Sequence, residues 1–252
     1  ENLLGREYYI LFELLFRQKN WREADKQSAR ILLIVTNQQS TGNLPIEAID
    51  GLPEEVLNKI DKFWLKASDS HFGWSIQAEL FSYFNGDLEQ MAKCCDWREE
   101  DAFFWKGWEK ITFDLSSKFG HLPWLAWKNL GNSSNLLGIK TFWGIKNSIG
   151  RTPFYQKLLA CGIGQNLGDD AKIKDEHYFY KRGKIKWRLG ENEGAIANFN
   201  EALAINSQYA EAYSSRGLVY EQIKNYQQAL LDCDKALEYD PDNTHLIARQ
   251  AN

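Results

Sequence analysis

The residues best suited to bind a ligand lie between Asp61 and Pro123. In this stretch Trp and Phe recur beside glycine and basic residues, as in residues 70–77 (Ser-His-Phe-Gly-Trp-Ser-Ile-Gln) and residues 120–123 (Gly-His-Leu-Pro). Large rigid aromatic side chains next to glycine turns, with a few cations nearby, suit a flat apolar molecule that has acidic edges. The stretch therefore predicts a binding site.

Patterns that would indicate an enzyme are missing. The four histidines are too scattered for metal ligation from one helix, and the sequence has no His-Glu-x-x-His motif. The glycines of residues 162–168 follow a predicted helix, whereas a dinucleotide fingerprint follows a strand. Acidic residues 99–101 are typical of a solvated face. We therefore expect a protein that is not an enzyme, with no catalytic residues, no metal site and no required cofactor.

The composition bounds the class of protein. At 252 residues, with 44% hydrophobic and 25% charged residues, the chain can bury a core and is unlike a disordered protein. A net charge of −4 argues against a nucleic-acid partner. Without an 18-residue apolar run no transmembrane segment is expected, and peripheral membrane contact is left open. The cysteines lack Cys-x-x-Cys spacing, and no signal-peptide pattern is present, so we expect a cytoplasmic protein. Because the chain begins at Glu1 and not at Met, the sequence leaves open that it is a fragment.

Apolar periodicity predicts helices in the first two thirds of the chain. Trp21, Phe63 and Trp64 lie on helical faces and are expected in the core. From Trp97 to Leu115 we expect a loop that leads into a strand-like or irregular element, and the glycine-rich residues 119–151 suggest a long loop or flap. The expected helices span residues 6–18, 45–50, 53–66, 75–84, 87–94 and 154–161. A further helix is expected to begin after Asn20, which would cap it.

The last third contains an internal repeat. Gly183 and Gly217 are 34 residues apart, and the same shift pairs Phe179 with Tyr213 and Ala195 with Ala229. This period, with small residues where two helices touch, resembles the tetratricopeptide repeat. We expect a linker at residues 164–175 and a domain at 176–252. That domain would hold repeats at 176–209 and 210–243, then the start of a capping or third-repeat helix.

Five motifs occur in a fixed order before the repeats. Together they resemble the "genomes uncoupled four" family of porphyrin-binding regulators of magnesium chelatase, from about Tyr8 to Ile163. The resemblance implies an all-α fold for residues 6–163, with a cupped face for protoporphyrin or magnesium protoporphyrin. The motifs are Asn-Trp-Arg-Glu-Ala-Asp (20–25), Lys-Ile-Asp-Lys-Phe-Trp (59–64), His-Phe-Gly-Trp-Ser-Ile-Gln (71–77), Trp-Arg (97–98) and Gly-His-Leu-Pro (120–123).

The resemblance also implies which residues hold the ligand. Ring contact would supply most of the affinity, since an exposed cation–carboxylate pair contributes only about 0–1 kcal/mol. Phe72 and Trp74 could instead belong to the core, and His121 could be either an axial metal ligand or a residue that orients its loop. The implied ligand residues are Phe72, Trp74, Trp97, Arg98, Phe113, Lys118, His121, Leu122, Pro123 and Trp124.

Two places depart from the family pattern. Ser70-His71 stands where relatives usually have Gly-Arg, and Ser117-Lys118-Phe119 replaces Ala-Pro followed by a basic residue. The loss of cations weakens the pairing expected for the propionate groups. The preferred ligand would then have moved, for example toward haem or a bilin.

Two functions follow as expectations. The first is a tetrapyrrole sensor, carrier or regulator, in a cyanobacterial setting, whose repeats recruit a protein such as the magnesium chelatase large subunit. The second is an interaction scaffold or signalling adaptor whose front domain binds another tetrapyrrole or none. In either case a basic aromatic stripe on the repeats could hold an acidic peptide. The stripe comprises His177, Tyr180, Lys181, Lys184 and Arg188.

Overall fold

The structure is a computed structural model that describes residues 6–40, 44–97, 110–123, 151–169, 171 and 173–241. Every regular element in these ranges is a helix, and none of the described residues forms a strand. The chain divides into two compact units, Glu1–Asn166 and Leu167–Asn252. The all-α fold expected from the sequence is therefore confirmed for the described residues.

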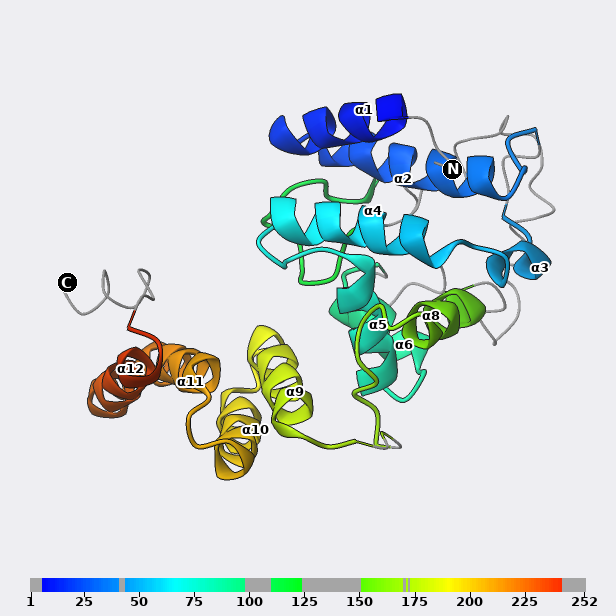
Figure 1. Cartoon of the computed structure of the whole chain (residues 1–252). Coiled ribbons are helices and arrows are strands. Elements are labelled where there is room, and N and C mark those ends of the chain that lie inside the picture. Colours follow the sequence, from blue (N-terminus) through cyan, green and yellow to red (C-terminus); the bar gives the residue numbers. More distant parts are fainter. Residues whose placement is uncertain are drawn as a thin grey trace. The chain divides into compact units, whose positions relative to one another are not determined.

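The first unit contains seven of the described helices (Figure 1). Their order follows the predicted one, and each boundary lies within a few residues of its predicted place. Among the helices of both units, none in the described ranges has the length and apolar character that a membrane span requires. The seven are α1 (Arg6–Arg17), α2 (Trp21–Val35), α3 (Ile46–Ile49), α4 (Glu54–Ala67), α5 (Trp74–Tyr83), α6 (Leu88–Cys94) and α8 (Arg151–Ala160).

Side-chain caps fix where two of these helices begin. The Oδ1 atom of Asn20 accepts a hydrogen bond from the Glu23 amide at 3.3 Å, which confirms the predicted cap of α2. Asp87 does the same for α6, because its carboxylate accepts from the amides of Glu89 and Gln90. Each cap satisfies N–H groups that have no partner inside the helix.

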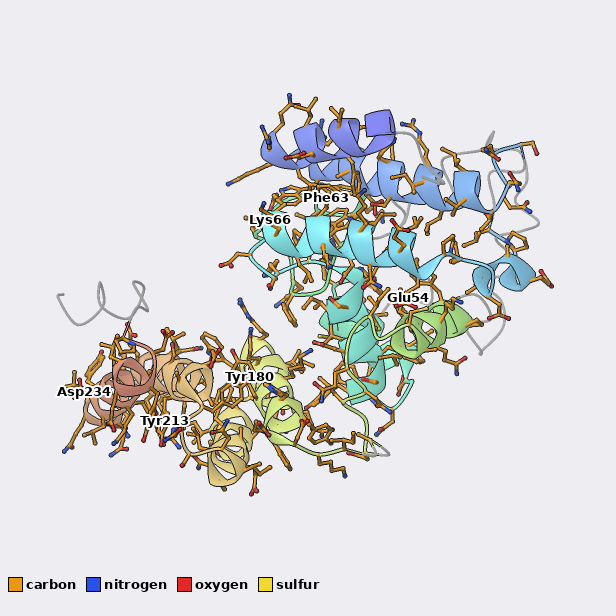
Figure 2. All side chains as sticks on the ribbon, in the orientation of Figure 1. Glu54, Phe63, Lys66, Tyr180, Tyr213 and Asp234 are labelled. Carbon is orange, nitrogen blue, oxygen red and sulfur yellow. The ribbon has the colours of Figure 1, made fainter. Side chains whose placement is uncertain are left out.

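An aromatic core joins α1, α2 and α4. Phe63, labelled on α4 in Figure 2, packs edge-on against Phe12 with 5.3 Å between ring centroids. The rings of Trp21 and Trp64 stack at 5.9 Å, and the Trp64 indole donates to the hydroxyl of Ser28. Trp21 and Trp64 are buried and Phe63 is half-buried, as their places on helical faces predicted. This core holds the C-terminal end of α4 in place.

The second unit consists of two helical hairpins. Corresponding helices of the two hairpins have equal lengths and begin 34 residues apart, which is the period indicated by Gly183 and Gly217. In Figure 1, α9 lies beside α10 and α11 beside α12. The four are α9 (Glu176–Arg188), α10 (Asn192–Ile205), α11 (Ala210–Gln222) and α12 (Tyr226–Tyr239).

Close contacts explain why the hairpins need small residues. A Cβ atom on Gly183 would lie 2.7 Å from the Phe199 ring, so only glycine lets α9 approach α10 this closely. In the second hairpin, the Arg216 guanidinium binds the buried carboxylate of Asp232 through two hydrogen bonds, at 2.8 and 2.6 Å. Burial lowers the pKa of Arg216, but the hydrogen bond and charge of Asp232 raise it further, so the net shift is upward.

Two predicted elements fall largely outside the described residues. Of the strand-like or irregular element expected from Trp97 to Leu115, the structure describes only Trp97 and residues 110–115. Residues 111–115 form no strand and are irregular, which was one of the two expectations. Of the loop expected at 119–151, residues 124–150 are outside the description.

Candidate functional site

Two segments of irregular backbone come together at the start of α5, and we call residues 68–73 and 110–123 the loop pair. The first segment turns the chain sharply between α4 and α5. Gly73 takes a φ of 149°, and a Cβ atom there would lie 2.9 Å from Oδ1 of Asp61. Glycine is required at this position both for the backbone angle and for the close approach.

Asp61 fastens this turn to the helix that follows it. Its carboxylate is buried on α4, and Oδ1 accepts a hydrogen bond of 2.9 Å from the Ser75 amide in the first turn of α5. A negative charge at a helix N-terminus is favourable, because the unsatisfied N–H groups give that end a partial positive charge. The motif residue Asp61 therefore fixes the angle at which α5 leaves the loop pair.

Hydrogen bonds join the two segments of the loop pair. The Gly73 amide donates to the Leu122 carbonyl at 3.1 Å, and the Gly120 amide donates to the His71 carbonyl at 3.0 Å. The His71 ring adds a third bond, because its Nε2–H donates to the Ser117 carbonyl at 2.8 Å. The segments therefore form one bonded structure, although about 50 residues separate them in the sequence.

Gln77 supports the loop pair from α5. Its side-chain amide donates to the carbonyl of Gly120 at 3.0 Å and to that of Pro123 at 2.8 Å. Its own oxygen accepts from the Tyr155 hydroxyl of α8 at 3.4 Å. One buried side chain thus holds both ends of the Gly-His-Leu-Pro segment.

His121 and Trp97 anchor the same segment from the other side. The His121 ring is fully buried, and its Nδ1–H donates to the carbonyl of Cys95. The indole of Trp97 donates to the His121 carbonyl at 2.7 Å. This geometry favours the loop-orienting role of His121 over the axial metal ligand, since a buried ring facing a carbonyl presents no nitrogen at the surface.

The side chains expected to form an aromatic ligand surface belong to the interior. Phe72, Trp74, Trp97 and Leu122 are each 0% exposed. Phe72 packs edge-on against Trp21, and Trp74 packs edge-on against Phe154 of α8. The core alternative left open for Phe72 and Trp74 is therefore the one found, and Trp97 and Leu122 also lie in the core beneath the loops, not on an exposed surface.

The other predicted ligand residues differ in their exposure. Pro123 is buried beside Leu122, whereas Lys118 is exposed and Phe113 is partly exposed. The guanidinium of Arg22, on α2, lies 4.6 Å from the centroid of the Phe113 ring. Arg98 and Trp124 lie outside the described residues.

A different set of side chains faces outward from the loop pair. Leu115 is 43% exposed, and the His71 ring lies 6.0 Å from that of Phe119. These apolar and basic groups are exposed or partly exposed, and other residues of the loop pair, among them Asp69 and Asp114, are exposed as well. We call the apolar and aromatic residues of this exposed or partly exposed set, together with Lys118, the loop surface; it comprises His71, Phe113, Leu115, Lys118 and Phe119.

Three residues of this region were not singled out from the sequence. Gln77 stood inside a motif but was given no function, and Leu115 and Phe119 were not assigned to the ligand. For Gln77 a signal was available, because it is a polar residue one turn into a mostly apolar helix, where a buried amide needs partners. For Leu115 and Phe119 no periodic signal exists, since loop residues have no regular direction.

In the repeats, the predicted stripe lies on α9. His177 and Arg188 are exposed, while Tyr180, Lys181 and Lys184 are partly buried. His177 is hydrogen-bonded to the Tyr209 hydroxyl at 2.9 Å, and the Lys184 ammonium lies 5.5 Å from the Tyr180 ring centroid. Burial raises the pKa of both Tyr180 and Tyr209, so these phenols stay protonated near neutral pH.

The described part of the chain contains no candidate metal site. Among those residues, no group of three or more His, Cys, Asp or Glu side chains is placed to hold an ion. The chemistry available at the loop pair is therefore contact with apolar rings, together with cations and polar groups that can orient a ligand's acidic groups.

Comparison with protein families matches both parts of the chain. The family model described as GUN4-like matches residues 4–138, which is more than half of the chain. A model described as TPR repeat matches residues 183–224, and one described as tetratricopeptide repeat matches residues 210–243. The last two matches confirm the repeat predicted from the 34-residue period.

Individual relatives match over shorter stretches. The chain is 26% identical over 115 residues to the chloroplastic tetrapyrrole-binding protein of Arabidopsis thaliana, covering 42% of this chain and 43% of that protein. It is 35% identical over 76 residues to the UDP-N-acetylglucosamine–peptide N-acetylglucosaminyltransferase of Giardia intestinalis, covering 29% of this chain and 5% of that protein. The chain thus spans less than half the length of either curated relative.

A solved structure is similar to part of the chain. The ligand-free structure of Arabidopsis thaliana GUN4 matches with a TM-score of 0.45 and 19% identity, covering 61% of this chain and 91% of that one.

Proposed function

The chain belongs to the GUN4-like family, as its ordered motifs indicated, and on that premise we propose that its first unit binds a tetrapyrrole. The second unit, with two tetratricopeptide hairpins, would bring a protein partner to the ligand-binding unit. The protein would act as a sensor, carrier or regulator, and its own side chains would perform no reaction.

The observation that carries the proposal is the family match over residues 4–138. That range includes both segments of the loop pair and the side chains that hold them together. The Arabidopsis relative, named for tetrapyrrole binding, supports the same ligand class. The bonded loop pair adds physical support, because a binding surface loses less conformational entropy when its backbone is already fixed.

The loop surface is the part of the described chain that we assign to ligand contact. Leu115 and Phe119 would lie against the flat ring, where most of the binding free energy of a large apolar ligand arises. Lys118 would face a propionate, and such an exposed pair would contribute only about 0–1 kcal/mol. The buried residues Phe72 and Trp74 would support this surface from beneath.

A titration tests tetrapyrrole binding directly. Purified protein is titrated with protoporphyrin, magnesium protoporphyrin, haem and biliverdin, and both the ligand absorption band and the Trp fluorescence are followed. We expect a saturable spectral shift with at least one of the four ligands. No response to any of them would contradict the proposal, and the ligand that binds most tightly would identify the preferred class.

Matched variants test the assigned surface. Leu115→Ala removes an exposed leucine of the loop surface, whereas Leu14→Ala removes one of similar exposure from α1 (43% and 46%). We expect Leu115→Ala to weaken binding about tenfold, since burial of a leucine side chain against a ligand contributes about 1.5–3 kcal/mol. Lys118→Ala should cost less than Leu115→Ala. Equal affinities for Leu115→Ala and Leu14→Ala would exclude this surface.

A narrower proposal concerns the partner. We propose that the ligand-bound protein assists magnesium chelatase, which is the role implied by the family that the motifs resemble. The large subunit of the chelatase would be the protein recruited by the repeats. Addition of this protein to a reconstituted chelatase should raise the rate of magnesium insertion into protoporphyrin, and an unchanged rate would contradict the proposal.

A scaffold without a ligand is the second candidate. It is favoured by the complete burial of Phe72, Trp74 and Trp97 and by the lost cation at position 71. A scaffold would give no spectral response in the titration but would still bind a partner through its repeats. The same measurement therefore separates the two functions.

A further inference from the structure

The first turn of α2 lies against the loop pair through two neighbouring side chains. Trp21 is buried, and its ring packs edge-on against Phe72 with 5.6 Å between ring centroids. Arg22 is exposed, and its guanidinium lies over the ring of Phe113, 4.6 Å from the centroid. In Figure 1 the segment that holds Phe113, drawn in green, runs beside α2. Arg22, which stands in the first of the five motifs but was assigned no role, is therefore adjacent to the loop surface.

The backbone at Arg22 is fixed on both sides. Asn20 caps α2 by accepting from the Glu23 amide at 3.3 Å, and the ring of Trp21 stacks with that of Trp64 at 5.9 Å. The phenyl ring beneath the guanidinium restrains the side chain further, because the negative face of an aromatic ring attracts a cation. A side chain that is already restrained loses less conformational entropy when it binds a ligand. The cation is therefore positioned at the edge of the loop surface before a ligand arrives.

The acidic residue next to Arg22 in the sequence is paired along the helix. The carboxylate of Glu23 binds the ammonium of Lys26 at 3.1 Å and the guanidinium of Arg30 at 3.0 Å. Its negative charge is thus balanced by two cations further along α2.

An acidic residue of the loop pair limits where a ligand's acid group can lie. Asp114, which follows Phe113, accepts hydrogen bonds from the amide and the hydroxyl of Ser116. These bonds lower the pKa of Asp114, so its carboxylate is charged at neutral pH and repels a second carboxylate placed beside it. An acid group of a ligand is therefore favoured on the side where Arg22 lies.

The chemistry of a guanidinium suits the edge of a tetrapyrrole. The flat faces of such a ligand are apolar, and its carboxylates project from the edge of the ring. Phe113 and Leu115 are two residues apart, so their Cα atoms lie within about 7 Å of each other. A ring that rests on Leu115 can therefore bring an edge close to Arg22. A guanidinium can donate two parallel hydrogen bonds to one carboxylate, which a lysine ammonium cannot do.

We propose that Arg22 determines the specificity of the site by binding a free carboxylate of the tetrapyrrole that lies on the loop surface. The site then selects tetrapyrroles with free acid groups over their esters, because an ester carries no negative charge. This inference rests on the proposed tetrapyrrole binding. It adds to that binding a cation from α2, outside the loop pair, and a class of preferred ligand.

Acid and ester forms of one ring test the role of Arg22. Protoporphyrin, magnesium protoporphyrin, haem and biliverdin are each compared with their dimethyl esters, which keep the ring but have no free carboxylate. The full chain is titrated with each form from the same organic stock, and quenching of Trp fluorescence gives the Kd. We expect the unmodified chain to prefer the acid. Arg22→Gln should weaken binding of the acid about fivefold and leave binding of the ester unchanged.

Two further variants separate this role from general effects of charge. Arg30→Gln removes an exposed arginine from the same helix, about 12 Å further along, and should leave the ratio of the two affinities unchanged. Arg22→Lys keeps the charge but not the planar donors, so it should restore only part of the preference for the acid.

The outcomes distinguish this inference from the proposed function. If the unmodified chain binds none of the tetrapyrroles, both fail. If it binds acid and ester equally well, or if Arg22→Gln weakens both forms to the same degree, the role of Arg22 is overturned while tetrapyrrole binding stands. An unchanged preference for the acid in Arg22→Gln would overturn the role of Arg22 as well.

Salt dependence gives an independent measurement. Interactions between exposed charges are screened by added salt. Raising the concentration of sodium chloride should therefore weaken binding of the acid more in the unmodified chain than in Arg22→Gln. The same salt dependence in both proteins would overturn the inference.

Discussion

A single buried amide holds the Gly-His-Leu-Pro segment, and its removal has a predictable cost. Gln77→Leu would leave the carbonyls of Gly120 and Pro123 without their donor in the interior. An unsatisfied buried group costs about 1–3 kcal/mol, so we expect the free energy of unfolding to fall by about 2–4 kcal/mol. Urea denaturation followed by Trp fluorescence measures this change.

Gln90→Leu serves as the control for Gln77→Leu. Gln90 is exposed on α6, where its side chain donates only to the exposed Asp87 carboxylate. This change should alter stability by no more than about 0.5 kcal/mol. If both variants were equally stable, the hydrogen bonds of Gln77 would contribute nothing to the fold.

At the same scale, residues on helices were more predictable than residues in loops. The Asn20 cap and the buried places of Trp21 and Trp64 followed from helical spacing and were confirmed. Phe72 precedes a glycine turn, where the sequence gives no period that would separate an inward from an outward direction. For that physical reason the sequence left both directions open for Phe72, and the structure shows it buried.

At the scale of the element, Asp87 ties the stability of α6 to pH. Burial raises the pKa of Asp87, but hydrogen bonds from Gln90 and Glu89 and the charge of Lys93 lower it, leaving it below the ordinary value. A lowered pKa stabilises the fold above the pKa of the unfolded state, about 3.9, and this contribution is lost as the pH falls through the folded pKa. We therefore expect Asp87→Ala to cost about 1 kcal/mol at pH 7 and less below pH 4.

The variant Asp87→Asn separates the cap from the charge. Asparagine keeps an oxygen acceptor for the helix amides but cannot ionise between pH 2 and pH 7. The stability difference between Asp87→Asn and Asp87→Ala should therefore stay constant over this range in urea titrations. A difference that disappeared with acid would contradict the cap assigned to the side-chain oxygen.

The contact between α9 and α10 depends on Gly183. Gly183→Ala would place a methyl group 2.7 Å from the Phe199 ring, so one helix must shift. Overpacking costs about 1–3 kcal/mol, while alanine regains up to about 1 kcal/mol in helix propensity. We expect a net loss of about 1–2 kcal/mol in the stability of the repeats, measured by thermal unfolding with circular dichroism.

Gly194→Ala is a matched control within the same hairpin. Its new methyl group would meet only the flexible end of Lys186, at 3.1 Å, which can move aside. Helix propensity should then leave stability unchanged or raise it by up to about 1 kcal/mol. Equal losses for the two variants would mean that the close approach at Gly183 is unimportant.

Elements were predicted best where the sequence repeats itself. Alignment of Gly183 with Gly217 predicted two helical hairpins. Their corresponding helices are equal in length, because the same residue types recur at the same contacts in each repeat. By contrast, the element before Leu115 was expected to be strand-like or irregular, and in residues 111–115 the irregular alternative holds. Aromatic and charged residues that recur with neither helical nor strand periodicity predict neither a helix nor a strand.

At the scale of the whole molecule, two compact units predict two unfolding transitions. Each unit has its own core, with Trp21 and Trp64 in the first and Phe199 in the second. Because a domain with its own core can unfold separately, we expect calorimetry of the full chain to resolve two transitions. Gln77→Leu should lower the midpoint of one, and Gly183→Ala should lower that of the other. A single transition shifted by both variants would contradict this.

The family and the repeats were predictable from the sequence because both rest on ordered motifs. The five motifs that end with Gly120–Pro123 led to the family that the match over residues 4–138 identifies. The composition of the loop surface was not predictable, because it depends on contacts between residues distant in the chain, such as the hydrogen bond from the Gln77 side chain to the Pro123 carbonyl.

The bonded loop pair has a consequence for diversification of this protein. The bonds between Gly73 and Leu122 and between Gly120 and His71 use only main-chain atoms, so they constrain the path of the loops but not the chemistry of most outward side chains. Substitution of Leu115 or Phe119 can therefore change the chemistry of the loop surface while the backbone of the loop pair stays the same. A combinatorial library at these positions is a practical route to a surface selected for a chosen ligand.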